Sequence, residues 1–243
     1  MIYFFIGSCI ASFINVVIER MPQHENYITG RSYCHYCGRN IQWYDLIPVL
    51  SYVFLKGKCR YCHHTIPLRE LGIEIFGGLL FLVCYYYYGM NIAMIMIYLF
   101  FMVLLAISMI DLKTLEIPDT LIVWCLIISI MTLPFIKIDI GERLLGSLII
   151  SVPMMMINFF IEDCFGGGDI KLIAVCGFFM GWKRVFIGTY IAIMIAGIFA
   201  GYYIFKHSQK RYMAFAPFLS IGMVLSILYG QNLYHFLFML LSS

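Results

Sequence analysis

The chain has 243 residues, of which 63% are hydrophobic and only 12% are charged. A soluble domain carries roughly 25% charged residues, so this chain lacks the polar surface needed to face water on all sides. The net charge of +3 is too small to indicate a nucleic-acid partner. The composition therefore excludes an ordinary soluble domain and predicts a protein whose solvent is a lipid bilayer.

Eight apolar segments are candidates for transmembrane helices. A helix needs about 20 apolar residues to cross the hydrocarbon core, which is ~30 Å thick. The candidate spans are residues 1–18, 71–89, 92–110, 119–136, 144–161, 170–182, 185–205 and 214–230. The first span is expected to be retained, because no basic residue precedes it and no small-residue cleavage site follows it. We therefore expect an all-α polytopic membrane protein with about eight transmembrane helices.

Basic residues divide the connections between these spans into two sets. The first set (20–70, 111–118, 162–171 and 206–213) holds Arg20, Arg31, Arg39, Lys56, Lys58, Arg60, Arg69, Lys113, Lys171, Lys206, Lys210 and Arg211. The second set (90–91, 137–143 and 183–184) holds Lys137, Arg143, Lys183 and Arg184. Because cytosolic loops are enriched in Lys and Arg, the first set is expected in the cytosol and both termini outside.

Residues 20–70 form the one long polar segment between the spans, and they contain two Cys-x-x-Cys pairs. The four cysteines are Cys34, Cys37, Cys59 and Cys62. Two such pairs are typical of a tetrahedral four-thiolate zinc site, which has no open position and is therefore structural. Two disulfides are the alternative, but the cytosol keeps thiols reduced. We therefore expect three parts: a first helix at 1–19, a cytosolic zinc-binding loop at 20–70 and a seven-helix bundle at 71–243.

Two aspartates lie at the edges of predicted spans on the expected cytosolic side. Asp111 ends the third span, and Asp169 begins the sixth. Acidic residues in or near spans are costly and usually functional. Two carboxyl groups sharing one site do not both ionise easily, so the pair can hold one proton and activate a water molecule. The sequence therefore suggests an aspartic protease site, with the acid and base roles unassigned.

Three glycines, Gly166, Gly167 and Gly168, precede Asp169, and their lack of side chains would let an extended substrate backbone approach. A purely structural reading stays open for the acids. Asp169 would then cap the sixth span, and Asp111 would pair with Lys113 or Lys171. Asp119, which follows Ile117-Pro118, is expected to lie at the start of the fourth span.

Several motifs, in order along the chain, resemble those of the type IV prepilin peptidases. They are Ala11–Pro22, Cys34–Cys37, Trp43–Tyr52, Lys56–Cys62, Asp111–Asp119, Gly166–Leu172 and Ala216–Phe218. The resemblance implies a GxGD-type aspartic endopeptidase of the bacterial cytoplasmic membrane, with Asp111 and Asp169 in the catalytic positions. Its partners would be prepilin or pseudopilin precursors, each losing a short basic leader at the cytosolic membrane boundary.

Many members of that family also N-methylate the new terminus with S-adenosylmethionine, and here the sequence departs from the family pattern. Arg69 and Glu74 are retained, but Glu70-Leu71 replaces a Tyr-Pro pair, and His35 replaces a proline of the first Cys-x-x-Cys pair. No Gly-rich nucleoside loop is apparent. The resemblance therefore implies proteolysis and leaves methylation open.

Three other classes of protein remain as alternatives. A transporter or channel also places acidic residues in spans, although it would put them at mid-depth. A zinc metalloprotease is disfavoured, because the sequence has no His-Glu-x-x-His motif and four cysteines leave no position for water. A scaffold protein that only binds through its zinc loop is the third alternative. The sequence does not indicate an oligomeric state.

Overall fold

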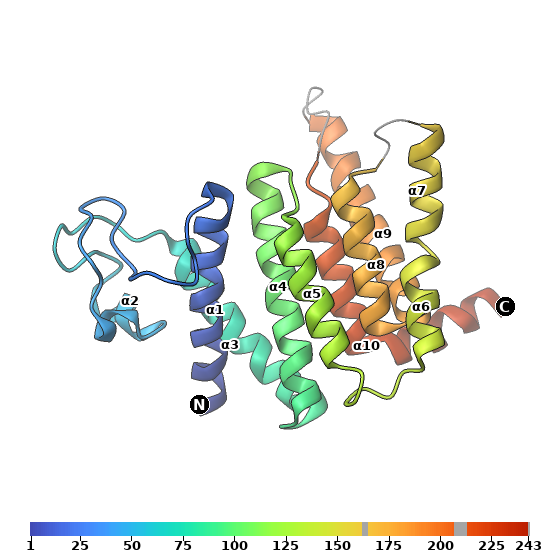
Figure 1. The fold of residues 1–243 in the computed structure, drawn as a ribbon, viewed down its shortest axis with the longest axis horizontal. Helices are drawn as coiled ribbons and strands as arrows, with labels where there is room; N and C mark the ends of the chain where they lie inside the picture. The colour runs from blue at the N-terminus through green and yellow to red at the C-terminus, as the bar shows by residue number, and fades with distance from the viewer. Residues whose placement is uncertain (162–164, 207–212, 243) are drawn as a thin grey trace. The chain divides into compact units, whose positions relative to one another are not determined.

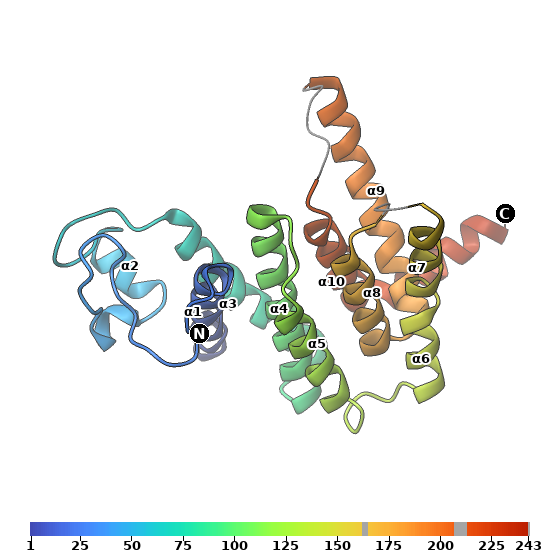
Figure 2. The ribbon, with the colours of Figure 1, turned by 45° about the horizontal axis from the view of Figure 1, so that its top comes forward.

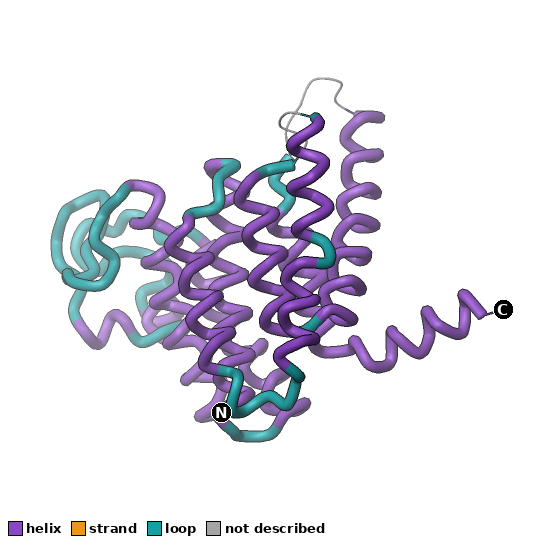
Figure 3. The backbone as a smooth tube through the Cα atoms, turned by 45° about the vertical axis from the view of Figure 1, so that its right-hand side comes forward, coloured by secondary structure: helices purple, strands orange, loops and turns teal. Residues whose placement is uncertain are grey.

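The computed structural model describes residues 1–161, 165–206 and 213–242, without the side chains of 204–205 and 231–242. Its elements are α1 (Ile2–Arg20), η1 (Met21–Gln23), η2 (Trp43–Leu46), α2 (Leu50–Phe54), α3 (Leu68–Tyr88), α4 (Ile92–Thr114), α5 (Asp119–Met131), α6 (Ile140–Leu148), α7 (Ser151–Phe160), α8 (Gly167–Met180), α9 (Trp182–Lys206) and α10 (Ala216–Ser242). Figure 1 labels the α-helices, and Figure 3 shows helices and loops but no strand in the described residues. The all-α prediction is confirmed. Two basic residues of the predicted cytosolic set, Lys210 and Arg211, lie outside the described residues.

Each predicted span coincides with helical structure, and five segments within the described residues are long and apolar enough to cross a membrane. These segments are Ile2–Gln23, Leu68–Tyr88, Ile92–Thr114, Ile140–Phe160 and Trp182–Tyr203. Two further apolar helices, Asp119–Met131 and Ala216–Gly230, are shorter. The predicted sixth span corresponds to α8, which has 14 residues. The membrane character is therefore clear, and the count of eight spans stays a prediction.

The predicted fifth span, 144–161, is divided into the two consecutive helices α6 and α7, which Figure 2 shows one after the other. The division lies just before Pro153, the third residue of α7. Proline has no backbone N–H, and its ring clashes with the carbonyl four residues earlier. In a continuous helix that carbonyl would belong to Ile149, which lies between the two helices.

The chain divides into two compact units, Met1–Met94 and Ile95–Ser243. In unit 1, α1 packs against α3. The helices approach closely at Gly7, where a Cβ atom would lie 2.6 Å from Cβ of Phe81 and 2.8 Å from the carbonyl oxygen of Gly77. The contacts thus group α3 with the first helix and the Cys loop, whereas the prediction assigned residues 71–243 to one bundle.

Most of the side chains of α4, whose larger part belongs to unit 2, are buried. Tyr98, Phe100 and Leu104 are each no more than 1% exposed. A helix that is hydrophobic on all sides is expected to be buried on all sides. The ring of Phe100 stacks on that of Phe179 of α8, with centroids 3.9 Å apart. On another side, Ser108 donates a hydrogen bond to Ser220 of α10 at 2.8 Å.

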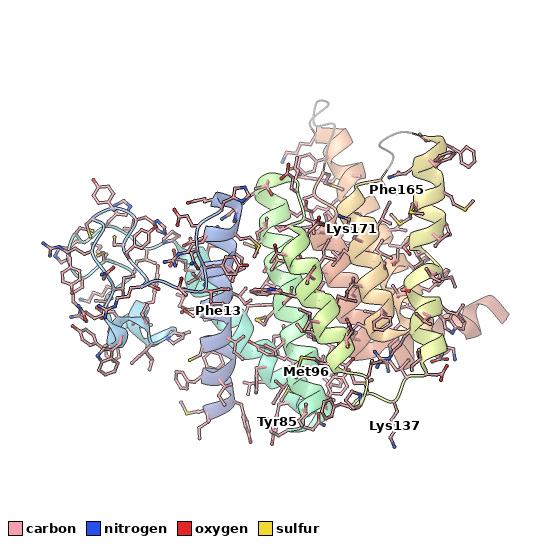
Figure 4. The ribbon with its side chains drawn as sticks, viewed as in Figure 1. Phe13, Tyr85, Met96, Lys137, Phe165 and Lys171 are labelled. Atoms are coloured by element: carbon pink, nitrogen blue, oxygen red, sulfur yellow. The ribbon has the colours of Figure 1, made fainter. Side chains whose placement is uncertain are left out.

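Successive helices of unit 2 alternate in direction, except that α7 continues the direction of α6, and this brings specific termini to one end (Figure 1). That end carries the C-terminus of α4 and the N-termini of α5, α8 and α10. Figure 4 labels Lys171 near this end of the unit and Lys137 at the opposite end. The fold therefore brings together segments that are more than 50 residues apart in the sequence, as the ion pair between Asp119 and Lys171 also shows.

Arg143 was expected in a connection outside the membrane, and it instead lies within α6 with no exposed surface. Its guanidinium donates to the carbonyl oxygens of Ile136, Ile138, Phe178 and Phe179 and to the hydroxyl of Thr132, over 3.1–3.4 Å. Two of these carbonyls belong to the C-terminal turn of α8, where helix carbonyls lack partners within the helix. Arg143 therefore joins α6 to the end of α8.

Candidate active site and metal centre

Asp111 and Asp169 come together within unit 2. Asp111 lies in the last turn of α4, and Asp169 is the third residue of α8. The Asp111 side chain is buried, with 5% of the residue exposed, and the two carboxyl groups are close enough to interact electrostatically. The fold thus places two acidic groups, 58 residues apart in the sequence, at one end of a buried helix pair.

The two carboxyl groups have different surroundings. Oδ2 of Asp111 accepts a hydrogen bond of 3.0 Å from the backbone N–H of Ala216, the first residue of α10. This bond fixes the orientation of the Asp111 carboxyl. Oδ1 of Asp169 is buried and has no hydrogen-bond partner among the described residues. Buried polar atoms are normally satisfied, so a carboxyl oxygen left without a donor is an exception that calls for an explanation, such as a role in catalysis.

The ion pair at this end of unit 2 does not involve Asp111 or Asp169. Nζ of Lys171 lies 2.7 Å from Oδ1 of Asp119, and both side chains are more than half exposed. The predicted alternative pairing of Lys171 with Asp111 is therefore not present. Asp119 is the first residue of α5, as the sequence indicated. The pair links the start of α5 to the start of α8, the helix that carries Asp169.

The three glycines before Asp169 differ from one another. A Cβ atom at Gly168 would lie 2.9 Å from Cβ of Ile117, so this glycine permits close packing inside the protein. A Cβ atom at Gly166 would lie nearest to Oδ2 of Asp169, also at 2.9 Å. A Cβ atom at Gly167 would have no such neighbour within 4 Å. Only Gly167 therefore faces open space that a substrate backbone would need.

The four predicted metal ligands, Cys34, Cys37, Cys59 and Cys62, also come together. Their sulfur atoms all lie within 4.8 Å of one another, and Sγ of Cys34 lies 3.8 Å from Sγ of Cys62. Four thiolates at the Zn–S distance of about 2.3 Å would be about 3.8 Å apart in a tetrahedron. The cluster can therefore hold a metal ion, and its four soft sulfur donors are compatible with zinc.

The two Cys-x-x-Cys turns share one backbone pattern. Cys34 N–H donates to Arg39 and Cys59 N–H to His64, while the carbonyls of both cysteines accept from the residue four positions later. That residue has a positive φ in each turn: 69° at Gly38 and 57° at His63. In the second turn, N–H groups of Cys62 and Tyr61 lower the pKa of Cys59 to about 7. The turn thus favours the thiolate at Cys59, whereas burial and hydrogen bonds with the neighbouring thiols raise the pKa of Cys62 to about 11.

The loop that carries these cysteines has little core of its own. Between residues 24 and 67 only Pro48 and Gly57 are buried. The loop is held to the helices of unit 1 by polar contacts: the Val49 N–H donates to Glu74 of α3 at 2.8 Å, and His35 lies 3.5 Å from Glu19 of α1. A ligand-bound cluster is therefore the natural organiser of this segment.

The sequence indicated the two aspartates and four cysteines but not all of their neighbours. The amide of Ala216 was part of a motif, yet nothing marked it as a donor to Asp111. Arg69 and Glu74 were noted only as retained residues, and the structure gives each a partner in unit 1. Arg69 donates to Glu19 at 2.9 Å, and Glu74 accepts from Val49. The donors to Asp111 and Glu74 are backbone amides, and a backbone amide leaves no residue-type signal in a sequence.

Two family models match the chain. The bacterial Peptidase A24 N-terminal domain matches residues 5–88, and the type IV leader peptidase family matches residues 97–201. These two ranges fall within unit 1 and unit 2 respectively. The model of the second range covers Asp111 and Asp169, and that of the first covers the four cysteines.

Curated relatives agree with these matches over nearly the whole chain. A prepilin leader peptidase/N-methyltransferase of Bacillus subtilis is 27% identical over 238 residues, covering 97% of this chain and 96% of the relative. Proteins of the same name from Vibrio cholerae and Pseudomonas putida are 28% and 26% identical, covering 86% and 94% of this chain and 87% and 90% of themselves. No solved structure is similar enough to match. These findings favour the peptidase reading over a transporter, and the chain belongs to the type IV leader peptidase family.

Proposed function

We propose that Asp111 and Asp169 are the catalytic pair of a membrane aspartic endopeptidase that removes the short basic leader of prepilins or pilin-like proteins. The observation that carries this proposal is that the carboxyl groups of buried Asp111 and half-buried Asp169 lie close enough to interact. The unpartnered Asp169 oxygen supports it, because a buried carboxyl oxygen without a donor is costly and is therefore a sign of a functional group. The relatives' printed names supply the substrate class.

The chemistry follows from two acids that hold one proton between them. The ionised carboxyl takes a proton from water as the water oxygen attacks the carbonyl carbon of the scissile peptide. The protonated carboxyl donates a hydrogen bond to the carbonyl oxygen and so stabilises the charge that develops there. A proton then passes to the leaving amine as the C–N bond breaks. The hydrogen bond from Ala216 keeps the Asp111 carboxyl in position through these steps.

We further propose that the aspartates face the cytosol of a bacterial cytoplasmic membrane and that both termini lie outside, as the distribution of Lys and Arg predicts. The apolar segment of the precursor would then lie among the helices, with its basic leader in the cytosol. The scissile bond is recognised largely by its depth at the membrane boundary. The Cys loop, with zinc bound to Cys34, Cys37, Cys59 and Cys62, is a structural part of the cytosolic side.

The test compares Asp111→Asn and Asp169→Asn with Asp119→Asn in purified full-length protein. Asparagine at 111 can still accept the Ala216 hydrogen bond, so the fold is expected to persist. We expect each of the first two variants to slow prepilin shortening roughly 10³-fold or more, since proton transfer is lost. Asp119→Asn is the matched control at the same end of unit 2, and it should keep activity. Undiminished cleavage by either dyad variant would refute the proposal.

Mass spectrometry of the product in the same assay reports the bond that is cut and any added methyl group. S-adenosylmethionine is the methyl donor that the resemblance implies, and the relatives carry methyltransferase names. A product heavier by one methyl group, only when this donor is present, would extend the proposal to methyl transfer. Chelator should inactivate slowly, through unfolding of the loop, because four cysteines leave no site for a catalytic water.

A further inference from the structure

An apolar segment of the Cys loop, residues 43–54, is exposed although it belongs to no predicted span. It comprises η2, α2 and the short connection between them. Trp43 is 77% exposed and Phe54 is 81% exposed. The exposed apolar side chains of the segment are those of Trp43, Leu46, Ile47, Leu50, Val53 and Phe54. Single apolar residues scattered over a surface are ordinary, whereas a concentration of this kind is a sign of an interaction surface.

The polar side chains within the segment have their partners inside the loop. Asp45, the only charged residue of the segment, forms two hydrogen bonds with Arg60, at 2.6 and 2.8 Å. The Ser51 hydroxyl donates to a carbonyl of the preceding turn at 2.6 Å, and the Tyr52 hydroxyl donates to the carbonyl of Ile66 at 3.1 Å. The segment therefore presents apolar side chains and no unpaired charge to its surroundings.

The segment lies beside the helices of unit 1 and not beyond their ends. The Val49 N–H donates to the Glu74 carboxylate at 2.8 Å, and the Ser12 hydroxyl also bonds to that carboxylate. Glu74 is six residues, about 9 Å, from the start of α3 at Leu68, and Ser12 is eight residues, about 12 Å, from the end of α1 at Arg20. Both positions fall inside segments that can cross a membrane. Figure 1 shows α2 level with the middle of α1 in the same unit.

The backbone at Val49 shows that the fold imposes this position. Its φ is 64°, a conformation that is rare for a β-branched residue. Such a conformation persists only where the surrounding contacts require it. The contacts here are the hydrogen bond to Glu74 and the burial of the neighbouring Pro48. The segment is therefore fixed against α3 while its apolar side chains face outward.

We propose that residues 43–54 lie in the interfacial layer of the bilayer, between the lipid headgroups and the acyl chains, with Trp43, Val53 and Phe54 inserted among the lipids. Trp and Tyr are enriched in this layer, because their rings combine an apolar body with a polar tip. Segments that lie on a membrane bury their apolar face about 5–10 Å deep there. The two Cys-x-x-Cys turns are outside the segment, so the metal cluster stays in water.

Three observations favour lipid over a protein partner as the cover of this segment. The helix that holds it, α3, itself exposes Phe76 and Leu79 by about half along a candidate span. The loop is tied at its two ends to α1 and α3, so the segment stays close to the bilayer. Lys56 and Lys58, which follow the segment, are exposed and form no ion pair in the described part of the chain. Their charges match the phosphate groups of anionic lipids.

The experiment follows tryptophan fluorescence of the full-length protein in nanodiscs of phosphatidylcholine and phosphatidylglycerol, in which both faces of the bilayer are open to solvent. The signal of Trp43 is the difference between the native chain and Trp43→Phe, because Trp124 and Trp182 are present in both. Acyl chains brominated near the headgroup quench tryptophan in lipid, and iodide quenches tryptophan in water. We expect the brominated lipid to remove about half or more of the Trp43 signal, and iodide to remove little of it.

The matched control is Ile28→Trp in the Trp43→Phe background. Ile28 is 74% exposed in the same loop but lies outside the segment, so a tryptophan there should be quenched by iodide and not by the brominated lipid. Quenching of Trp43 by iodide would place it in water. Quenching by neither agent would place it under protein, such as a second copy of the chain. Either result overturns the proposal.

A second measurement uses the double variant Val53→Asn/Phe54→Asn in the same nanodiscs. Without its apolar anchors the segment should leave the lipid, so trypsin should cut after Lys56 and Lys58 about tenfold faster or more than in the native chain. Metal content shows whether the Cys loop is still folded. An unchanged cutting rate in a variant that keeps its metal contradicts the insertion. If the variant loses its metal, the quenching of Trp43 in the native chain decides alone.

Discussion

The two units reach stability in opposite ways. In unit 1, the loop between residues 24 and 67 has two buried residues, and polar contacts and four cysteines give it shape. In unit 2, α4 buries mostly apolar side chains, and Asp111 and Arg143 are among the few buried charged groups. The comparison shows how parts of one chain fold in two different solvents, water and lipid. The loop that faces water needs a ligand for its core, and the bundle that faces lipid needs packing and satisfied polar groups.

The strongest test of this contrast is Cys34→Ser. We expect the variant to lose its metal and the loop to lose its fold, because metal binding in small structural zinc sites supplies about 10 kcal/mol or more of folding free energy. Unit 2 should remain folded. Metal analysis and limited proteolysis measure the two effects. Cys9→Ser is the control, since Cys9 is exposed and lies outside the cluster. An unchanged metal content, or an equally resistant loop, would contradict the contrast.

The second test concerns the polar exception within unit 2. Arg143→Met should lower the free energy of unfolding by about 3 kcal/mol, because several buried carbonyls lose their donor. The carbonyls of Phe178 and Phe179 at the end of α8 are the most affected. Thermal unfolding in detergent measures the loss. Lys137→Met, at an exposed position near the same end, should leave the midpoint nearly unchanged. A similar midpoint in both variants would show that Arg143 is not a structural link.

These tests also separate what the sequence could predict from what it could not. The Cys-x-x-Cys spacing and the apolar runs indicated the metal cluster and the helices, since both follow from local patterns. Arg143 was expected in an exterior connection, because the topology prediction only counts Lys and Arg between the apolar segments. Such a count cannot distinguish an exposed arginine from a buried one that donates to carbonyl groups. The division of the fifth span was missed although Pro153 is visible in the sequence. The apolar segment 144–161 was long enough to suggest one unbroken helix.

The candidate site shows the same limit. Consecutive spans cross the membrane in opposite directions, so the end of the third span and the start of the sixth lie on the same side. This placement predicted that Asp111 and Asp169 could meet. The donor to Asp111 is a backbone amide of Ala216, which any residue type except proline could supply. The sequence offered Lys113 or Lys171 as a partner for Asp111, whereas Lys171 pairs with Asp119. Long-range pairing of this kind depends on how the helices pack, and local patterns in a single sequence do not predict that packing.

A third test sharpens the role of packing in unit 2 through two neighbouring glycines. Gly168→Ala should destabilise the protein by about 1–3 kcal/mol, because its methyl group would press against Ile117. Gly167→Ala meets nothing within 4 Å and should keep the stability of the native chain. If the substrate backbone passes over Gly167, however, that variant should raise KM for prepilin. Equal stability of the two variants would argue against close packing at Gly168.

The smallest expected effect comes from the ion pair between Lys171 and Asp119. Both side chains are more than half exposed, so Lys171→Met should cost less than about 1 kcal/mol, and added salt should reduce that cost further. The pair between Arg60 and Asp45 in unit 1 is the informative comparison. It has two hydrogen bonds, and only 5% of the Asp45 side chain is exposed.

We therefore expect Asp45→Asn to disturb the loop more than Asp119→Asn disturbs the bundle, although both variants remove one carboxylate from one ion pair. Thermal unfolding and loop proteolysis at low and high salt measure the two effects. If the exposed pair of unit 2 proved the stronger, polar contacts would have to contribute more to the bundle than its burial suggests. Prepilin cleavage by Lys171→Met, within about twofold of the native rate, would further show that the exposed pair is separate from Asp111 and Asp169.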